Sequence, residues 1–411
     1  MIDVLDTPDR HGYSEPMDPP GARRLRDVEP FLAMEVLERA LAMEREGTAV
    51  SHLEVGEPDS PAPEPVIEAC QRALRAGVTH YTDSRGVEQL REAIAADLQR
   101  RFGVSVEPSR VIVTMGTSPA MWLSFQTLID PGDEVVLGTP HYPCYPNFIR
   151  LCGGVPVYVE TDPDDRYCLD PERVRAALTP RTRAILVCSP ANPTGAVQTR
   201  ETIAELAALG PTLVSDEIYD GLVYDTARVS SALEHTRDAF VFDGFSKRYA
   251  MTGFRLGWVV APEWAARPLQ ILQQSLFISA SSFVQHAGIA ALEQGAPAVE
   301  AMRARYAMRR TRLVDGLRRL GFGVAPHPPG AGVVLADARP LGSCGRDSRE
   351  LAFALLERAH VGSTPGIDFG SAAEGWLRFS YAVADEVIDE ALARLEAALP
   401  QLADPVRGVA R

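Results

Sequence analysis

Seven short and almost wholly apolar runs constrain the fold of this chain more than any other feature. They occupy residues 111–113, 134–137, 155–159, 184–187, 212–214, 239–242 and 257–260. Helix-like stretches separate them, and continuous apolar strands that alternate with helices are typical of a parallel sheet covered on both faces. The sequence therefore predicts an α/β fold with a mostly parallel sheet sandwiched by helices.

The pattern changes after this region. A long amphipathic helix is expected from about 298 to 320, closing at Gly321. Shorter strands follow at 333–335 and 376–380, and a last helix from about 384 to 399. We interpret the long helix as a connector to a second, smaller domain. Residues 1–27 contain Pro19 and Pro20 and lack periodicity, which predicts a flexible N-terminal arm.

The charge balance limits the class of partner. The chain has 411 residues, with 41 basic and 55 acidic side chains and a formal charge of −14. Such a charge opposes nucleic acid and anionic membranes, so we expect small-molecule partners. No apolar run approaches the roughly 18 residues of a membrane span, and the acidic start lacks the features of a signal peptide, so we expect a cytoplasmic protein.

The basic residues are unusual in kind, because all but Lys247 are arginine. A guanidinium does not deprotonate, whereas a neutral amine can attack a carbonyl carbon. The count by itself leaves two interpretations open, a reactive amine or a lysine that persisted by chance.

Polar residues follow several of the predicted strands. Ligands of open parallel sheets bind beyond the carboxyl ends of the strands, so these positions are candidates for a site. After 111–113 the chain reads Gly116, Thr117 and Ser118, with Ser118 expected as the N-cap of a helix and Pro119 as its first residue. A helix start of this kind binds anions, although an ordinary capped helix has the same pattern.

Three further strand ends continue the series. Asn192 follows 184–187, Asp216 and Tyr219 follow 212–214, and Lys247 follows 239–242. Each residue singly is compatible with a turn, a cap or a surface ion pair. Their joint occurrence at consecutive strand ends predicts one functional site.

These motifs resemble those of the pyridoxal-phosphate enzymes of fold type I, in particular the class I/II aminotransferases related to bacterial aspartate aminotransferases. The resemblance extends from about Phe31 to Leu399. It rests on Asn-Pro-Thr-Gly at 192–195, Ser-Asp-Glu-Ile-Tyr at 215–219, Ser-Lys-x-x-x-Met-x-Gly-x-Arg-x-Gly at 246–257 and the run at 81–86. We accordingly divide the chain into the arm, an N-terminal part of a small α+β domain (28–55), a large cofactor-binding domain (56–297), and a connector helix with the C-terminal part of the small domain (298–411).

The resemblance implies a role for each candidate residue. Lys247 would form a Schiff base with pyridoxal 5'-phosphate and later move a proton between substrate and cofactor. Asp216 would keep the pyridine nitrogen protonated, so that the ring accepts electrons. Asn192 and Tyr219 would hydrogen-bond the phenolic oxygen, and Tyr142 would stack on the ring.

The remaining assignments concern the phosphate and the substrate. The resemblance implies that Gly116, Thr117, Ser118, Ser246 and Arg255 hold the phosphate, with Tyr81 contributed by the neighbouring subunit of a homodimer. Arg378 would bind the substrate α-carboxylate as a bidentate fork, beside Asn192 and the backbone of Gly56. The alternative for Arg378 is an exposed strand arginine.

The expected reaction is ping-pong transamination between an amino acid and a 2-oxo acid. A lyase or cyclase of the same fold is the alternative, since it would use the same cofactor residues. A transcription regulator with an aminotransferase-like domain is a third class, but it requires a basic helix-turn-helix segment that the stretch before Phe31 lacks. No metal site is expected, because neither C-x-x-C nor H-E-x-x-H occurs.

Two features differ from the family pattern. Ser118 occupies the position where related aspartate aminotransferases often have a lysine for the distal carboxylate of the substrate. The run at 329–334 has glycine and valine where the family usually has an aromatic pair, which predicts a roomier pocket near Gly332. Both features count against a preference for aspartate.

Overall fold

The computed structural model describes residues 22–225, 228–324 and 327–403. Its main sheet contains seven strands, in the spatial order β2-β8-β7-β6-β5-β3-β4. Their bounds are β2 Val111–Thr114, β3 Glu134–Thr139, β4 Val155–Glu160, β5 Thr182–Cys188, β6 Thr212–Asp216, β7 Ala239–Gly244 and β8 Gly257–Val260. All seven predicted runs are therefore strands of this sheet. β8 runs antiparallel to both of its neighbours while the other pairs are parallel, which confirms the predicted mostly parallel α/β fold.

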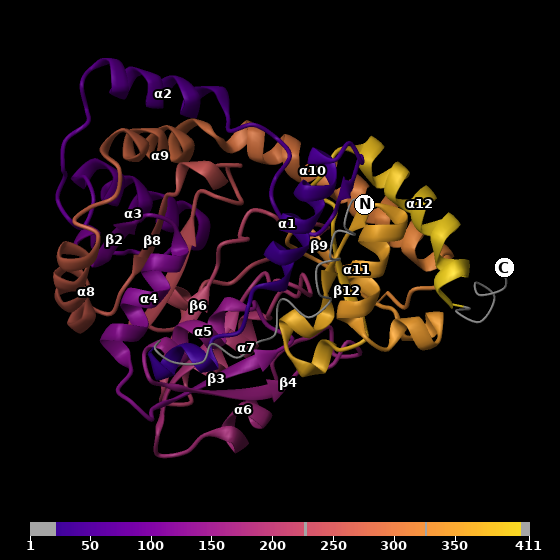
Figure 1. Cartoon of the computed structure of the whole chain (residues 1–411). Coiled ribbons are helices and arrows are strands. Elements are labelled where there is room, and N and C mark those ends of the chain that lie inside the picture. Colours follow the sequence, from indigo (N-terminus) through magenta and orange to yellow (C-terminus); the bar gives the residue numbers. More distant parts are fainter. Residues whose placement is uncertain (1–21, 226–227, 325–326, 404–411) are drawn as a thin grey trace, which may run out of the picture.

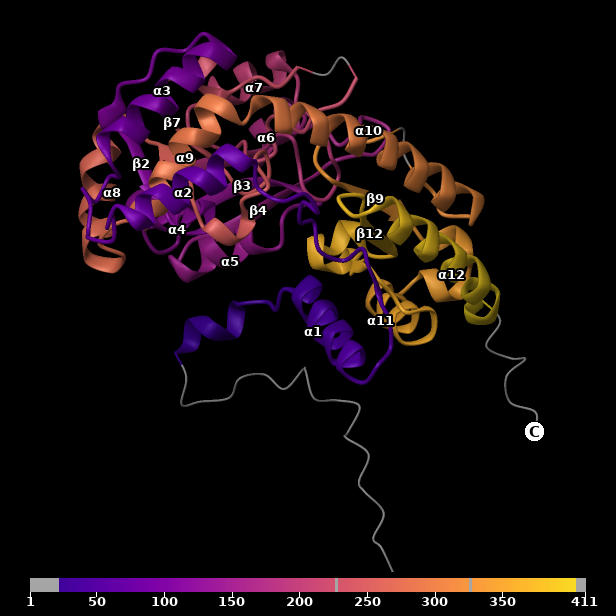
Figure 2. The ribbon, with the colours of Figure 1, turned by 90° about the horizontal axis from the view of Figure 1, so that it is seen from above.

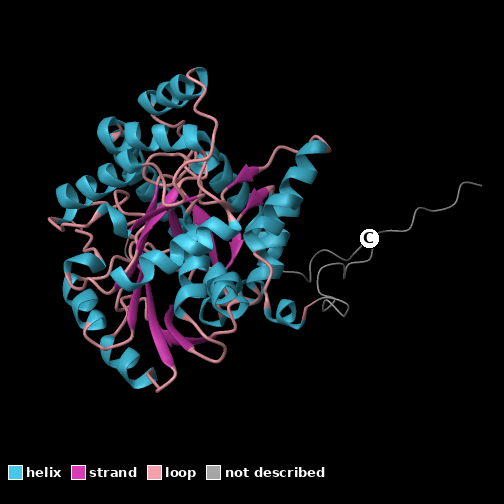
Figure 3. Cartoon of the chain, turned by 90° about the vertical axis from the view of Figure 1, so that its left-hand side faces the viewer, coloured by secondary structure: helices cyan, strands magenta, loops and turns pink. Residues whose placement is uncertain are grey.

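Helices cover both faces of this sheet (Figures 1 and 3). One face carries α2 (Glu64–Arg75), α3 (Glu88–Phe102), α6 (Pro171–Ala177), α7 (Arg200–Ala207) and α9 (Ser282–Gln294). The other carries α4 (Thr117–Leu128), α5 (Cys144–Leu151) and α8 (Glu263–Leu276). Successive strand residues point to opposite faces, so Val111 and Val113 enter one core and Ile112 the other. Because both faces of the inner strands are buried, these strands read as continuous apolar runs.

The C-terminal part has its own small sheet, with the antiparallel order β11-β12-β9. The elements of this C-terminal part are β9 (Val333–Asp337), β10 (Val361–Gly362), β11 (Thr364–Pro365), β12 (Trp376–Ser380), α11 (Ser348–Ala359) and α12 (Asp385–Ala403). The N-terminal α1 (Leu32–Arg45) packs against α11 and β11, and β1 (Ser51–His52) pairs with β10. The long helix α10 (Ala296–Arg319) contacts α9 at one end and α12 at the other (Figure 2).

The predicted flexible arm lies outside the described residues, except for its last part. There, Arg23–Asp27 form a 3-10 helix beside α5, which corrects the expectation of an arm over all of 1–27. Arg150 donates to the carbonyl oxygen of Asp27 at 3.2 Å, and Asn147 pairs with both backbone groups of Glu29. These contacts are polar and none of the helix residues is buried, so apolar periodicity carries no sign of them.

Candidate active site

The topology of the main sheet brings the candidate residues to one edge. β2, β3, β5, β6 and β7 run in the same direction, so the segments that follow them all leave at their carboxyl ends. β8 runs in the opposite direction, and Arg255 lies two residues before it. The antiparallel strand therefore delivers Arg255 to the same edge from its own amino end.

A cavity of about 350 Å³ lies at this edge, between the main sheet, α1 and β12. All the predicted site residues line it except Gly116 and Tyr81. The lining residues among them are Gly56, Thr117, Ser118, Tyr142, Asn192, Asp216, Tyr219, Ser246, Lys247, Arg255 and Arg378. Gly116 directly precedes this lining at the start of α4. Tyr81 is 80% exposed and lies outside the cavity.

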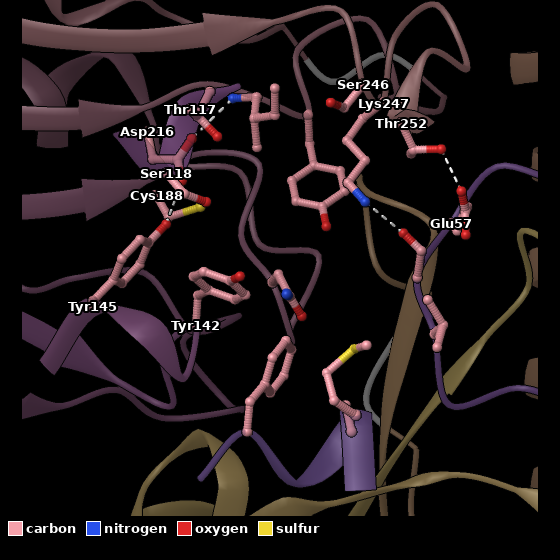
Figure 4. Close-up of a pocket in the computed structure, with 18 of the residues that line it drawn as sticks. Glu57, Thr117, Ser118, Tyr142, Tyr145, Cys188, Asp216, Ser246, Lys247 and Thr252 are labelled. Atoms are coloured by element: carbon pink, nitrogen blue, oxygen red, sulfur yellow. Dashed lines mark hydrogen bonds between the residues drawn. The ribbon is translucent and has the colours of Figure 1, made fainter. Parts of the chain in front are cut away.

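Lys247 enters the cavity from the segment after β7 (Figure 4). Its Nζ donates to the carbonyl oxygen of Gly56 at 2.8 Å and lies 5.9 Å from the centre of the Tyr219 ring. Burial lowers the pKa of this amine to about 8, and the charges of Arg378 and Arg255 act in the same direction. Glu57 and Asp216 oppose the shift. A larger fraction of this amine is neutral near pH 7 than of an ordinary lysine, as a nucleophile or base requires.

Asp216 ends β6 and is 4% exposed. The Tyr145 hydroxyl donates to its Oδ2 at 2.6 Å, and the backbone N–H of Ile218 donates to Oδ1 at 3.2 Å. Burial raises the pKa of this carboxyl to about 6, while these two hydrogen bonds and the charge of Lys247 lower it. The carboxylate is therefore mostly ionised at neutral pH and can hold a proton on a bound base.

Arg378 is 3% exposed, so it is not the exposed strand arginine of the alternative interpretation. Its Nη1 donates to Asn192 Oδ1 at 3.0 Å, and its Nη2 donates to the carbonyl oxygen of Glu54 and to Thr364 Oγ1. Its Nε is buried without a hydrogen-bond partner in the described part of the chain. None of the described ion pairs involves Arg378. A buried guanidinium with a free N–H suits a carboxylate ligand.

The start of α4 forms a cradle for an anion. The helix begins at Thr117 with Gly116 as its N-cap, which corrects the expectation that Ser118 is the N-cap and Pro119 the first helical residue. Gly116 has φ +94°, and a Cβ there would lie 2.8 Å from Arg255 Nη2. No side chain caps this helix end, so its first N–H groups remain available. Together with the hydroxyls of Thr117, Ser118 and Ser246, they form a donor set that fits a phosphate dianion.

Comparison with known proteins identifies the family. A family model described as aminotransferase class I and II matches residues 48–395. The chain belongs to this family. An aspartate/prephenate aminotransferase of Thermus thermophilus is 40% identical to it over 91% of this chain and 97% of the relative. A valine–pyruvate aminotransferase of Mycobacterium tuberculosis is 38% identical over 91% and 97%.

Solved structures agree with this assignment. The aspartate aminotransferase of Thermus thermophilus with maleate superposes with a TM-score of 0.87, at 39% identity, covering 92% of this chain and all of that chain. The chain is therefore an aminotransferase with the fold of the type I pyridoxal-phosphate enzymes. Among the described residues, no cluster of His, Cys, Asp and Glu is arranged to hold a metal ion. No described helix is long and apolar enough to cross a membrane.

Some residues of this aminotransferase site escape sequence reasoning. Tyr145, whose hydroxyl binds Asp216, and Thr252 both line the cavity. So does one side of α1, through Phe31, Ala33, Met34 and Leu37. Spacing gives a signal for Tyr145, which follows Tyr142 by three residues, and for Phe31, Met34 and Leu37, which recur every three residues.

One expectation about the cavity is wrong. Gly332 does not line it, and a Cβ added there would meet the Cβ of Ala382 at 3.3 Å. The glycine-rich run at 329–334 is packed against neighbouring backbone, with Ala331 donating to the carbonyl oxygen of Leu222 and Tyr381 donating to that of Gly332. It therefore leaves no extra space near the site.

Proposed function

We propose that this aminotransferase depends on pyridoxal 5'-phosphate and carries an amino group from an amino acid to a 2-oxo acid in a ping-pong reaction. The observation that carries the proposal is the environment of Lys247. The only lysine of the chain is buried in the cavity, with a pKa of about 8, near Asp216 and two arginines, Arg255 and Arg378, that lack carboxylate partners within the described residues.

The donor set of the cavity supports cofactor binding. Arg255, Thr117, Ser118 and Ser246, with the backbone at Gly116, would hold the phosphate. Asp216 would hold the proton of the ring nitrogen, positioned by Tyr145. Asn192 and Tyr219 would hydrogen-bond the phenolic oxygen, and the Tyr142 ring would pack on the pyridine. When bound, pyridoxal phosphate supplies an acceptor for the electrons released at the substrate Cα.

The protein's own groups would handle the proton and the substrate. Lys247, with its pKa near neutral pH, is suited to take the proton from the substrate Cα and to donate it to a carbon atom of the cofactor. Arg378 would bind the α-carboxylate, using its free Nε, and thereby hold Cα near Nζ of Lys247. The carbonyl group of Gly56, which accepts from Nζ, would keep the amine directed into the cavity.

The lining of the cavity favours an amino donor whose side chain is uncharged. Lys247, Arg255 and Arg378 are the cations of the described lining, and each already has an assignment. No described cation remains for a distal carboxylate, and α1 presents Phe31, Met34 and Leu37 to the same space. We infer a donor with an apolar side chain, rather than aspartate. One relative is named for valine and others for aspartate, so the names leave the donor open.

A homodimer with a shared site is part of the proposal. Tyr81 is 80% exposed and would reach the phosphate site of a second copy. Its segment lies beside the end of α8, where Thr82 N–H meets Ser279 Oγ at 3.4 Å. The last turns of α8 and the residue pair after it expose large apolar side chains, namely Ile271, Leu276 and Ile278. Such a patch is typical of an interface.

The domain division follows from the same contacts. We propose that 28–55 and 298–411 form the small domain and 56–297 the large one. The packing of α1 on α11 and the pairing of β1 with β10 support the first part, and the contacts of α10 with both α9 and α12 support its role as connector.

The test is a single-turnover experiment with the cofactor-loaded protein. Leucine or phenylalanine alone should bleach the visible absorption of the lysine-bound cofactor, and a 2-oxo acid should restore it. Aspartate should react more slowly at equal concentration. Lys247→Ala should lose both the visible band and turnover, and full turnover in that variant would exclude the assignment. Release of ammonia without any need for a 2-oxo acid would exclude transamination.

A further inference from the structure

The amino end of α1 is held by a residue far away in the chain. The N-cap position, Phe31, offers no side-chain acceptor. Instead Asp368 accepts from the N–H of Leu32 at 3.0 Å through Oδ1 and from the N–H of Ala33 at 3.2 Å through Oδ2. A carboxylate at this place satisfies two otherwise unpaired donors and the positive end of the helix dipole. Asp368 thus supplies the capping side chain of α1 in place of the N-cap residue Phe31, although 336 residues separate it from Leu32.

α1 has two different apolar faces. Val36, Ala40 and Met43 pack against Leu356 of α11. The cavity side presents Phe31, Met34 and Leu37, spaced by three residues. Met34 is 48% exposed although it lines the cavity, because this side of the helix borders open space. The position of α1 therefore sets how far this apolar wall lies from the reacting groups.

Asp368 belongs to a short helix, η7 (Gly366–Phe369), that also borders the rest of the site. The next residue, Phe369, has its ring 5.1 Å from the guanidinium carbon of Arg378. The carbonyl oxygen of Phe369 accepts from the N–H of His141 at 3.0 Å, one residue before Tyr142. Tyr142 in turn meets the ring of Phe31 edge-on, with 5.8 Å between ring centres. One segment thus borders the α-carboxylate anchor, the aromatic wall and the start of α1.

We propose that Asp368 is a positioning residue for the side chain of the amino donor. By holding the start of α1, it fixes Phe31, Met34 and Leu37 at the distance from Arg378 and Lys247 that an apolar side chain needs. The proposal rests on the function proposed above, because it takes Arg378 as the carboxylate anchor and an apolar amino acid as the donor. Asp368 does not line the cavity, so it would act through the position of α1. Its charge also acts on Arg378, and Asp368→Asn, which removes that charge but keeps an acceptor oxygen, separates the two effects.

A second aspartate provides a matched control for a purely structural role. Asp347 is the N-cap of α11 and accepts from the N–H of Glu350 at 2.8 Å. It lies in the same part of the chain as Asp368, and neither aspartate lines the cavity. Asp347→Ala removes one capping hydrogen bond at an exposed position, whereas Asp368→Ala removes two at a partly buried one. Of the two helices, α1 lines the cavity and α11 does not.

The experiment compares Asp368→Ala, Asp368→Asn and Asp347→Ala in the cofactor-loaded, full-length protein. For Asp368→Ala we expect the KM for leucine to rise roughly 3- to 20-fold, the range that loss of an N-cap produces, with kcat changed less than about 2-fold. Asp368→Asn keeps an acceptor oxygen and should stay within about 3-fold of wild type. Asp347→Ala should lower the melting temperature without raising KM. The visible absorption of the cofactor should be the same in all.

A second measurement does not depend on turnover. Amide hydrogen exchange of the first turn of α1, in the protein without substrate, should be faster in Asp368→Ala than in Asp347→Ala. An unchanged KM in Asp368→Ala, or an equal rise in Asp347→Ala, overturns the proposal. Failure of the wild-type protein to react with any amino acid would instead exclude the proposed function. In that case, equal rates of amide hydrogen exchange in the first turn of α1 in Asp368→Ala and Asp347→Ala would still overturn the positioning of α1 by Asp368.

Discussion

The cofactor-free protein offers one lysine amine to chemical reagents, and its reactivity should follow the lowered pKa of Lys247. Burial is the main cause of this shift, from 10.5 to about 8. At pH 7 about a tenth of such an amine is neutral, against roughly one part in 3,000 at the ordinary pKa. Lys247 should therefore react with an amine-directed reagent ~300-fold faster than an exposed lysine of equal intrinsic nucleophilicity, before any reduction by restricted access.

The assay is trace labelling with an acylating reagent across pH 6 to 11, read by mass spectrometry of the peptide that contains Lys247. The single lysine makes the assignment unambiguous, because the α-amino group of Met1 lies in a different peptide. A midpoint near 8 supports the reasoning. A midpoint near 10.4, the value of an unperturbed lysine, refutes it.

Two variants test the cause of the shift, with opposite signs. Glu57 raises the pKa of Lys247, so Glu57→Gln should move the midpoint below about 8. Arg255 lowers that pKa, so Arg255→Gln should move the midpoint upward. Movement of both variants in one direction would mean that the nearby charges do not control this amine.

Three more predictions concern neighbouring contacts. Tyr145→Phe removes a hydrogen bond that lowers the pKa of Asp216, so that pKa should rise above about 6. Cofactor affinity should then weaken by ~1–2 kcal/mol, most strongly at low pH. A titration of cofactor binding between pH 5 and 8 tests this prediction. Gly116→Ala should raise the cofactor Kd at least ~10-fold, because the new Cβ meets the Arg255 guanidinium. Gly132 has a similar φ of +91° but open space around it, so Gly132→Ala should lower stability alone. Fluorescence titration of cofactor binding and thermal melting separate the two effects. Arg101 forms ion pairs with Asp97, Asp220 and Asp243, so Arg101→Met should leave buried carboxylates uncompensated and lower the unfolding free energy by ~3–5 kcal/mol in urea. Addition of Asp243→Asn should recover part of this loss. A loss below ~1 kcal/mol would contradict the prediction.

The main sheet could be predicted because its physics is local. The inner strands are buried on both faces, so their runs are almost wholly apolar and are visible without knowledge of their neighbours. The edge strand β4 is an exception, since Val155 and Tyr158 are exposed. The strand-end rule then places Asn192, Asp216 and Lys247 at one edge, and all three line the cavity. The strands β10 and β11 are harder to predict, since each has only two residues, and β10 pairs with the distant β1 outside the small sheet.

The missed features depend on contacts between distant parts of the chain. Asp368 caps a helix that begins 336 residues earlier, and no short-range pattern reveals this pairing. The start of α4 was misplaced because Gly116, at φ +94°, lets the helix begin at Thr117, whereas Ser118 and Pro119 suggested a later start. The supposed space at Gly332 disappears because Ala382 packs there.

The contrast between lysine and arginine in the cavity follows from one physical effect acting on two chemistries. Burial lowers the pKa of Lys247 and of Arg378 alike, and it is the largest cause in both. The amine starts near 10.5 and reaches about 8, where proton exchange at neutral pH becomes possible. The guanidinium starts so much higher that it remains protonated after the same desolvation. A single cavity can therefore contain an arginine that stays charged, as the proposed carboxylate anchor requires, and a lysine that can lose its proton, as the proposed nucleophile and base requires. Exchanging the two residues should therefore lose both proposed functions.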